Sequence, residues 1–300
     1  MSIWNNTAVL GLYSLSPLHY GTGQTSGAVD LPIARDTATG IPVLPASGIK
    51  GVVRSVMADA LDEQAVKRLF GPKLEAGGED GLSVGALSFT EARLLAYPAR
   101  SLSRPFLHVT CPLVLEALAR TLRATGADRV IDAGALDLPA GTGARLADQA
   151  LAAGALVLED LIYAESEVRH DPAVRKIGDL LANLLPADES ATRERLRSGL
   201  VVIPDADFTA LMESAVPVQA RVKLTSGKTT GTYGGETGNL WYEEVLPSDC
   251  LFAALIGERR ARMMPIRPTW EGSPTPRSSC ACSRSAATRR WAMASASVRC

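Results

Sequence analysis

The chain has 300 residues, of which 46% are hydrophobic and 21% charged, and its formal net charge is −1. This composition is typical of a globular protein with a sizeable core. It excludes a surface coated with basic residues, so any nucleic acid would be held by local basic groups. No stretch of about 18 apolar residues is long enough for a membrane helix, and the first residues lack the pattern of a signal peptide. We therefore expect a cytoplasmic protein.

A glycine-rich loop and a helix stand out in the first part of the chain. Residues 19–27 form the loop. Ser47 is a candidate N-cap, and apolar side chains recur at the helical period from there to Leu61. Lys50 and Arg54 are four positions apart, so they share one face of the predicted helix.

The remaining predicted elements mix strands and helices, without an internal repeat. Strands are expected at 8–14, 84–96, 156–163 and 200–203. Helices are expected at 110–125, 172–185 and 189–197, the second beginning after Asp171-Pro172. Residues 132–154, rich in Ala, Gly and Leu, are expected to be irregular. This mixture predicts an α+β fold.

A long hairpin is predicted at residues 217–246. Residues 217–224 alternate apolar with polar or basic side chains, and residues 240–245 are again of an extended type. The intervening residues 226–239 hold five glycines and no proline. Two such strands joined by a glycine-rich loop are typical of a hairpin with a mobile tip.

The last part of the chain differs in character from the rest. Residues 263–300 hold six Arg and one Glu but neither Asp nor Lys, together with three of the five cysteines. One interpretation is a disordered basic tail. The other is a frameshift, because the codons of Trp291 and Met293, each followed by alanine, spell Gly-x-Gly in another frame. The predicted organisation is one domain over residues 1–262 and a separate tail.

Four motifs, in order along the chain, carry a family resemblance. They are His19-x-Gly-x-Gly, Val29-Asp-Leu-Pro-Ile-x-Arg-Asp36, the Ser-Gly-Ile-Lys-Gly segment between Thr39 and Arg54, and Asn239-Leu-Trp-Tyr-Glu-Glu244. Together they resemble the RAMP superfamily of CRISPR–Cas proteins, and more narrowly the backbone subunit of type III-B (Cmr) complexes, over roughly residues 5–255. The resemblance implies a ferredoxin-like (RRM-like) palm with insertions and a protruding β-hairpin, for which residues 217–246 are the candidate.

The chemistry of these motifs suits the backbone of an RNA strand. Gly21 and Gly23 lack a Cβ, so a ligand can approach the main chain closely. A helix that opens at Ser47 presents free N–H groups to phosphate, and Lys50 and Arg54 add positive charge. Such contacts hold RNA without reading its bases, as a subunit that binds guide RNA of any sequence requires.

Three further sets of residues each have two interpretations. His19 either contacts RNA or supports Asp30. Arg221 lies on one face of the predicted hairpin, where it either contacts RNA or is merely exposed. Glu243 and Glu244 either pair with basic residues of the hairpin or take part in catalysis.

Asp30 is the catalytic candidate that the resemblance implies. Taken alone, a carboxylate just before Pro32 is typical of a turn cap. In the family, this aspartate supports metal-dependent cleavage of target RNA, so the resemblance implies an endoribonuclease that acts within the assembled complex. The implied chemistry is attack of a ribose 2′-hydroxyl on the adjacent phosphate with a divalent metal, Mg²⁺. A single aspartate is a poor metal site, so RNA phosphates would supply further ligands.

The resemblance also implies the partners: guide RNA, target RNA, copies of the chain in a filament and other subunits of the Cmr complex. Two alternative functions stay open at this point. One is a scaffold that binds guide RNA and does not cut. The other is a metal-independent ribonuclease that processes guide RNA with His19 as general base. Removal of divalent metal separates this activity from Asp30-dependent cleavage.

Overall fold

The computed structural model describes residues 4–24, 27–72, 84–127, 132–136 and 141–259, and the predicted tail at 263–300 lies outside them. The main sheet has the strand order β1-β15-β4-β5-β10-β6-β9, with β2 paired to β4 and β3 paired to β15. Its strands are β1 (Trp4–Tyr13), β2 (Val43–Leu44), β3 (Leu87–Phe89), β4 (Ala92–Arg100), β5 (Phe106–Thr110), β6 (Ala144–Leu146), β9 (Val168–His170), β10 (Leu200–Val202) and β15 (Leu251–Arg259). The helices are α1 (Ala46–Ala58), α2 (Glu63–Phe70), α3 (Pro112–Thr125), α4 (Pro172–Ala182), α5 (Ser190–Gly199) and α6 (Asp205–Ser214), with short 3-10 turns at Ala133–Leu136 and Glu165–Glu167.

The fold is α+β, as predicted, and its sheet is mixed. β5 and β10 are parallel, as are β6 and β9, whereas the other neighbours in the main sheet are antiparallel. Most residues of β4 and β15 are buried, because both strands lie inside the sheet. Their sequences are therefore mostly continuous apolar runs and lack the alternation of apolar and polar residues that a half-exposed strand shows. The sequence patterns above do not predict β15.

α1 begins directly after Pro45, one residue before Ser47. The prediction that Ser47 caps this helix is therefore wrong, since Ser47 lies within the first turn. Pro45 is extended and occupies the cap position, and its carbonyl accepts the backbone N–H of Gly48. The sequence also predicts one helix as far as Leu61, but α1 is shorter and α2 follows it, with the Asp62 carboxylate accepting the N–H of its third residue.

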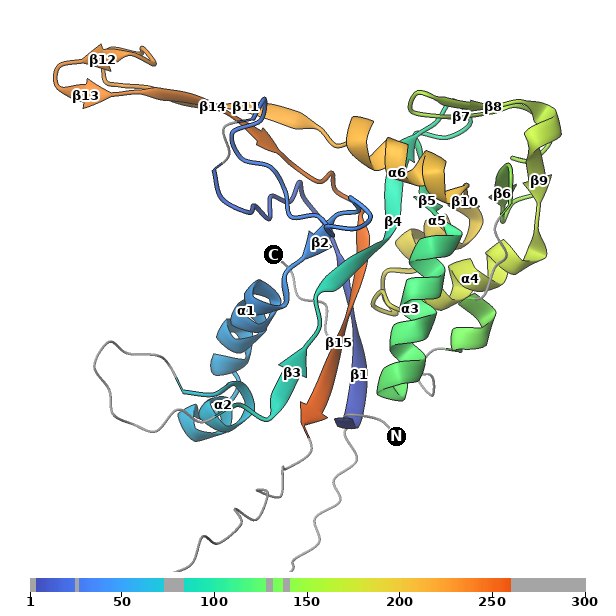
Figure 1. Ribbon diagram of the computed structural model, residues 1–300, viewed down its shortest axis with the longest axis horizontal. Coiled ribbons are helices and arrows are strands. Elements are labelled where there is room, and N and C mark those ends of the chain that lie inside the picture. Colours follow the sequence, from blue (N-terminus) through green and yellow to red (C-terminus); the bar gives the residue numbers. More distant parts are fainter. Residues whose placement is uncertain (1–3, 25–26, 73–83, 128–131, 137–140, 260–300) are drawn as a thin grey trace, which may run out of the picture.

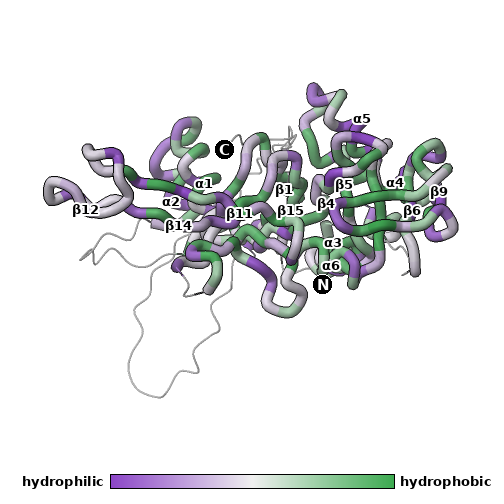
Figure 2. Tube along the Cα trace, turned by 90° about the horizontal axis from the view of Figure 1, so that it is seen from above, coloured by the Kyte–Doolittle hydropathy of each residue, from purple (hydrophilic) through white to green (hydrophobic). Residues whose placement is uncertain are grey.

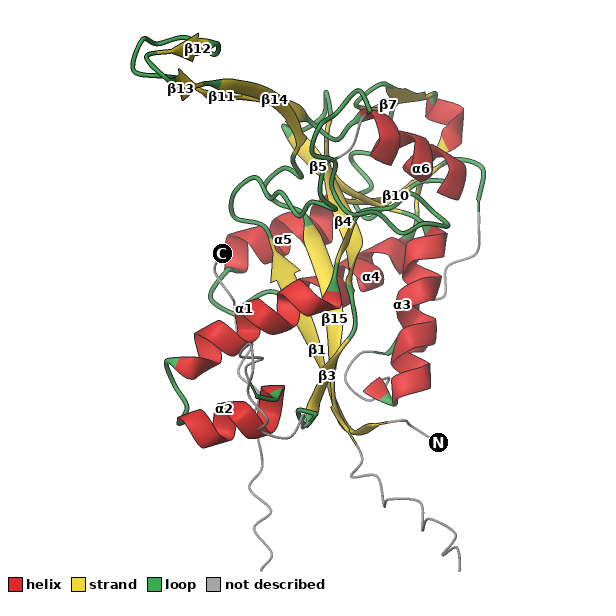
Figure 3. Cartoon of the chain, turned by 60° about the vertical axis from the view of Figure 1, so that its left-hand side comes forward, coloured by secondary structure: helices red, strands yellow, loops and turns green. Residues whose placement is uncertain are grey.

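The predicted helices in the middle of the chain are confirmed. Gly126 ends α3 in a left-handed conformation with φ of 74°, and Asp171 caps α4 by accepting the N–H of Ala173. α6 is not predicted from the sequence. Figures 1 and 3 show α1 and α3 on either side of β1 and β15. No helix in the described part of the chain is long and apolar enough to cross a membrane.

Two predictions for the middle of the chain are wrong. Residues 156–163 form two short antiparallel strands, β7 (Leu156–Leu158) and β8 (Leu161–Tyr163), because the chain turns at Glu159, where φ is 51°. The Glu159 carboxylate accepts the backbone N–H of Arg100 at 2.8 Å, which ties this turn to β4. Within residues 132–154, expected to be irregular, β6 pairs with both β9 and β10. A three-residue strand is too short to show a period.

The two strands predicted for the hairpin pair with each other. They are β11 (Val218–Lys223) and β14 (Asn239–Glu244), with the smaller pair β12 (Thr232–Tyr233) and β13 (Glu236–Thr237) toward the tip (Figure 1). Directly opposed residues share a face of such a ribbon. One face exposes the apolar side chains Val218, Val222, Leu240 and Tyr242, and the other carries Arg221, Trp241 and Glu243. Figure 2 shows hydrophobic residues gathered in the central strands, whereas the hairpin tip is more hydrophilic.

Candidate nucleic-acid interface

Three segments that are distant in the sequence meet at the base of the hairpin. They are residues 18–22, residues 31–35 and the end of β14 with the residues that follow it. The bridges between them are Gly21–Ile33, Leu31–Glu243 and Leu18–Leu246. Because Asp30 directly precedes the second segment, these bridges place its carboxylate beside β14.

Asp30 is half-buried, and its carboxylate accepts the backbone N–H of Tyr242 at 2.8 Å. Among the described residues, the Asp30 side chain makes this one hydrogen bond. The carboxylate is thus attached to β14 through one of its two oxygens. A carboxylate in this position can orient a metal ion or accept a proton from a hydroxyl group.

His19 lies next to Asp30's loop and is oriented by the main chain. Its Nδ1 lies 2.7 Å from the carbonyl oxygen of Glu244. Since a carbonyl only accepts, Nδ1 carries the hydrogen and donates it, which leaves Nε2 for another partner. A Cβ on Gly21 would lie 2.5 Å from this Nε2. Gly21 is therefore needed to make room for the His19 ring.

The glycine-rich loop packs against the start of α1. The hydroxyl of Tyr20 occupies the place that a Cβ on Gly48 would take. Gly23 is exposed, with φ of 102° and open space around its Cβ position, so the backbone there favours glycine for conformational reasons. Ser47, at the exposed first turn of α1, adjoins this contact.

Lys50 and Arg54 lie further along α1, so the structure separates them from the hairpin base. The Lys50 ammonium donates to the carbonyl oxygen of Leu87 at 3.4 Å. Burial lowers the pKa of Lys50, and the positive charges of Arg259 and Arg54 lower it further. None of these three cations has an acidic partner in the described part of the chain. The result is a local concentration of positive charge on a molecule whose net charge is −1.

The adjacent glutamates of β14 make different contacts. Glu244 accepts the backbone N–H of Ile33 at 2.9 Å and the guanidinium of Arg35 at 3.3 Å. Glu243 pairs with Arg221 at 3.4 Å and lies 3.8 Å from Nδ1 of His19. The prediction that these glutamates pair with basic residues of the hairpin is confirmed for Glu243, whose partner is Arg221. It is wrong for Glu244, whose partner Arg35 lies outside the hairpin. Its position within the Val-Asp-Leu-Pro-Ile-x-Arg motif is the signal that could have found it.

The donor set of this region suits a metal that is shared with a substrate. In the described ranges, no cluster of three or more His, Cys, Asp or Glu side chains is arranged to hold a metal ion. Asp30 offers one carboxylate. Mg²⁺ commonly keeps several waters and binds one or two carboxylates together with substrate phosphates. Asp30 could therefore hold such an ion only with RNA phosphate as a co-ligand.

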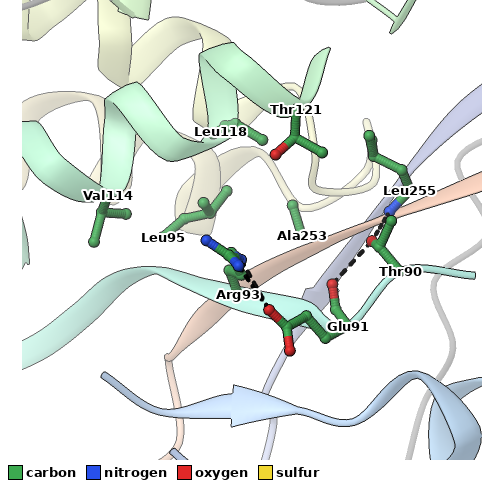
Figure 4. Close-up of a pocket in the computed structure, with 9 residues that line it drawn as sticks. All are labelled: Thr90, Glu91, Arg93, Leu95, Val114, Leu118, Thr121, Ala253 and Leu255. Carbon is green, nitrogen blue, oxygen red and sulfur yellow. Dashed lines mark hydrogen bonds and ion pairs between the residues drawn. The ribbon is translucent and has the colours of Figure 1, made fainter. Parts of the chain in front are cut away.

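A cavity of about 270 Å³ lies elsewhere, between α3 and strands β4 and β15 (Figure 4). Its wall is mostly apolar, with Leu95, Leu118 and Leu255 among the lining residues. At its edge Arg93 and Glu91 are joined by an ion pair of 2.8 Å. It contains none of the predicted site residues, so the candidate interface lies outside this cavity.

The fold and this surface define an α+β protein with a hairpin arm and a polar site at the base of the arm. The chain belongs to the RAMP superfamily, because the sequence pattern of that family matches residues 12–265. It is 33% identical over 254 residues to the CRISPR system Cmr endoribonuclease Cmr4 of Pyrococcus furiosus. The aligned region covers 83% of this chain and 80% of that relative. The family predicted from the four motifs is confirmed.

Solved structures show the same fold. The crystal structure of oligomeric Cmr4 from Pyrococcus furiosus matches with a TM-score of 0.61 and 24% identity, over 85% of this chain and 82% of that one. A chain in the cryo-EM structure of the type III-B Cmr-beta complex bound to cognate target RNA matches with a TM-score of 0.66 and 18% identity, over 87% and 86%.

Proposed function

We propose that this chain is a guide-RNA-binding filament subunit of a type III-B CRISPR effector, and that it cleaves target RNA at regular intervals. The observation that carries the proposal is the 33% identity to a Cmr endoribonuclease over 83% of the chain. Its partners are guide RNA, target RNA, copies of itself and other Cmr subunits, and it acts with them in the cytoplasm.

Guide RNA is bound through its phosphates along α1 and the glycine-rich loop. Lys50 and Arg54 supply positive charge that no described acid neutralises, and Ser47 lies in the first turn of α1, at the positive end of the helix dipole. Gly23, with open space around its Cβ position, keeps the main chain of the loop accessible. These contacts are independent of base identity.

The sheet acts as a ferredoxin-like palm, and the hairpin wedges into the guide–target duplex. The two faces of the hairpin support this role. The apolar face, with Tyr242 46% exposed, suits contact with bases or a neighbouring copy. On the polar face, Arg221 and the nearby His19 suit phosphate.

Asp30 promotes cleavage of the target strand at the base of the hairpin. The ribose 2′-oxygen attacks the adjacent phosphorus, the bond to the 5′-oxygen breaks, and the 5′-oxygen takes a proton from water. The products are a 2′,3′-cyclic phosphate and a 5′-hydroxyl. Asp30 accepts the 2′-hydroxyl proton or positions the metal. A divalent ion, Mg²⁺, would be held by Asp30 and RNA phosphates and would stabilise the charge that develops on the phosphate.

Reconstitution with guide RNA and complementary target tests the proposal. Wild type and Asp30→Ala are compared for assembly and for target cleavage, with Mg²⁺ or with EDTA. Regular cuts that require both Asp30 and Mg²⁺ are expected. Cuts that persist in assembled Asp30→Ala complexes would reduce the chain to a scaffold, and metal-independent cutting of guide-precursor RNA would favour the processing activity with His19 as base.

A further inference from the structure

The Glu244 side chain is attached to the segment that carries Asp30. One carboxylate oxygen accepts the backbone N–H of Ile33 at 2.9 Å, and the other accepts from Arg35 at 3.3 Å. The main chain adds a bond from the N–H of Glu244 to the carbonyl of Leu31 at 3.0 Å. Glu244 therefore contacts three residues of the segment that follows Asp30, namely Leu31, Ile33 and Arg35.

Arg35 extends this attachment into the body of the protein. Its guanidinium also donates to the carbonyl of Met212, in α6, at 2.9 Å and to that of Gly40 at 3.0 Å. The planar fork of arginine suits such simultaneous contacts, whereas lysine offers a single point charge. The side chains of Arg35 and Glu244 are 23% and 16% exposed, so water screens their attraction only in part.

Glu243 has another environment, although it is the next residue. Its carboxylate faces Arg221 and His19, on the polar face of the hairpin. No described contact joins its side chain to the segment from Asp30 to Arg35. The two glutamates of this motif therefore have separable roles.

We propose that Arg35 and Glu244 are positioning residues, which hold the Asp30 carboxylate in its reactive place by locking residues 31–35 between β14 and α6. This inference rests on the proposed function, because it assumes that Asp30 promotes cleavage. The pair does not touch the reacting atoms. It acts through the segment that follows Asp30.

The fold of the segment does not depend on the pair alone. The N–H of Ala34 donates to Tyr20 at 2.8 Å and that of Leu31 to Tyr242 at 3.0 Å, both to carbonyl oxygens. Loss of the pair should therefore loosen the segment without unfolding the protein. A misplacement of about 1 Å can cost on the order of 10²-fold in rate, so small movements of Asp30 are measurable.

The test uses assembled complexes that contain Glu244→Gln, Arg35→Met or both substitutions. Glutamine keeps an acceptor for Ile33 but loses the charge that holds Arg35. We expect the single-turnover cleavage rate to fall about 10- to 100-fold, while target affinity stays within about twofold. The double variant should be no slower than the slower single variant, because both substitutions remove the same interaction between Arg35 and Glu244. Glu91→Gln, which removes the partner of Arg93 on an exposed surface, is the matched control.

Hydrogen exchange of peptides that contain Ile33 gives a readout that does not depend on cleavage. Exchange should be faster in Glu244→Gln and Arg35→Met but unchanged in Glu91→Gln. If Asp30→Ala abolishes cutting but both Glu244→Gln and Arg35→Met cleave at the wild-type rate, the positioning role is wrong. The proposed function of Asp30 would still stand. Equal losses of rate and of target affinity would also overturn the positioning role. If Asp30→Ala cuts normally, the proposed function itself fails, and the exchange result shows separately whether the pair holds the segment.

Discussion

The backbone N–H of Tyr242 donates to the carboxylate of Asp30 at 2.8 Å, although 212 positions separate the two residues. The base of the hairpin and the proposed cleavage residue therefore form one structural unit. A movement of β14 moves the carboxylate with it. If the hairpin binds RNA as proposed, this hydrogen bond would couple RNA binding to cleavage at Asp30.

Replacement of Asp30 by asparagine separates charge from structure. The amide oxygen can still accept the N–H of Tyr242, so the free energy of unfolding should change by less than about 0.5 kcal/mol. Cleavage should fall by at least about 10²-fold, because asparagine neither accepts a proton nor binds a metal ion strongly. Thermal denaturation and single-turnover cleavage measure the two effects. Cutting at the wild-type rate by Asp30→Asn would contradict a role for the charge.

The contact between Tyr20 and Gly48 predicts different effects for two glycines of α1. Alanine at position 48 collides with the Tyr20 ring and should destabilise the protein by about 1–3 kcal/mol. Alanine at position 51 meets nothing within 4 Å and should stabilise it by about 0.5–1 kcal/mol. Urea denaturation of both variants tests this. Tyr20→Leu should restore stability to Gly48→Ala, and equal stabilities of the two alanine variants would refute the contact.

Neutralisation of the α1 cations should weaken binding of guide RNA. Lys50→Gln and Arg54→Gln should each lower the slope of log affinity against log salt by about 1, because each removes one phosphate contact. The loss should be the same for guides of different sequence. Affinity measurements over a salt series test this, with Lys67→Gln on α2 as the control. An unchanged slope in all three variants would remove α1 from the RNA path.

His108 should make the fold less stable in mild acid. Burial lowers the pKa of His108 to about 4, and Nδ1 has no hydrogen-bond partner within the described residues. Between pH 6.5 and about pH 4, His108 is therefore protonated in the unfolded chain but neutral in the folded chain. The free energy of unfolding falls as the pH drops through this range. Between pH 7 and pH 5 the loss should be about 2 kcal/mol.

Denaturant midpoints at pH 7 and pH 5 measure this loss. His108→Gln should show a smaller difference between the two pH values, since glutamine does not titrate. His170→Gln, at an exposed position, serves as the control and should keep the wild-type difference. A wild-type difference in His108→Gln would assign the acid sensitivity to other groups.

Local patterns predicted much of the secondary structure, and for identifiable reasons. Asp171-Pro172 is a complete helix-start signal, so α4 begins where expected. Strands β11 and β14 were predicted because a glycine-rich loop joins an alternating run to a second run of extended type. The predicted start of α1 is off by two residues, because Pro45, not Ser47, occupies the cap position. β15 was missed because a strand buried on both faces shows no alternation.

The sequence by itself determined the family, the α+β class and the identity of the candidate residues, since motifs and periodicity are properties of neighbouring positions. Only the tertiary structure decided which of those residues lie together. It joined Asp30 and His19 to β14, placed Lys50 and Arg54 apart on α1, and gave Glu243 and Glu244 different contacts. The physical reason is that hydrogen bonds between segments more than two hundred positions apart depend on strand pairing, which no local pattern records.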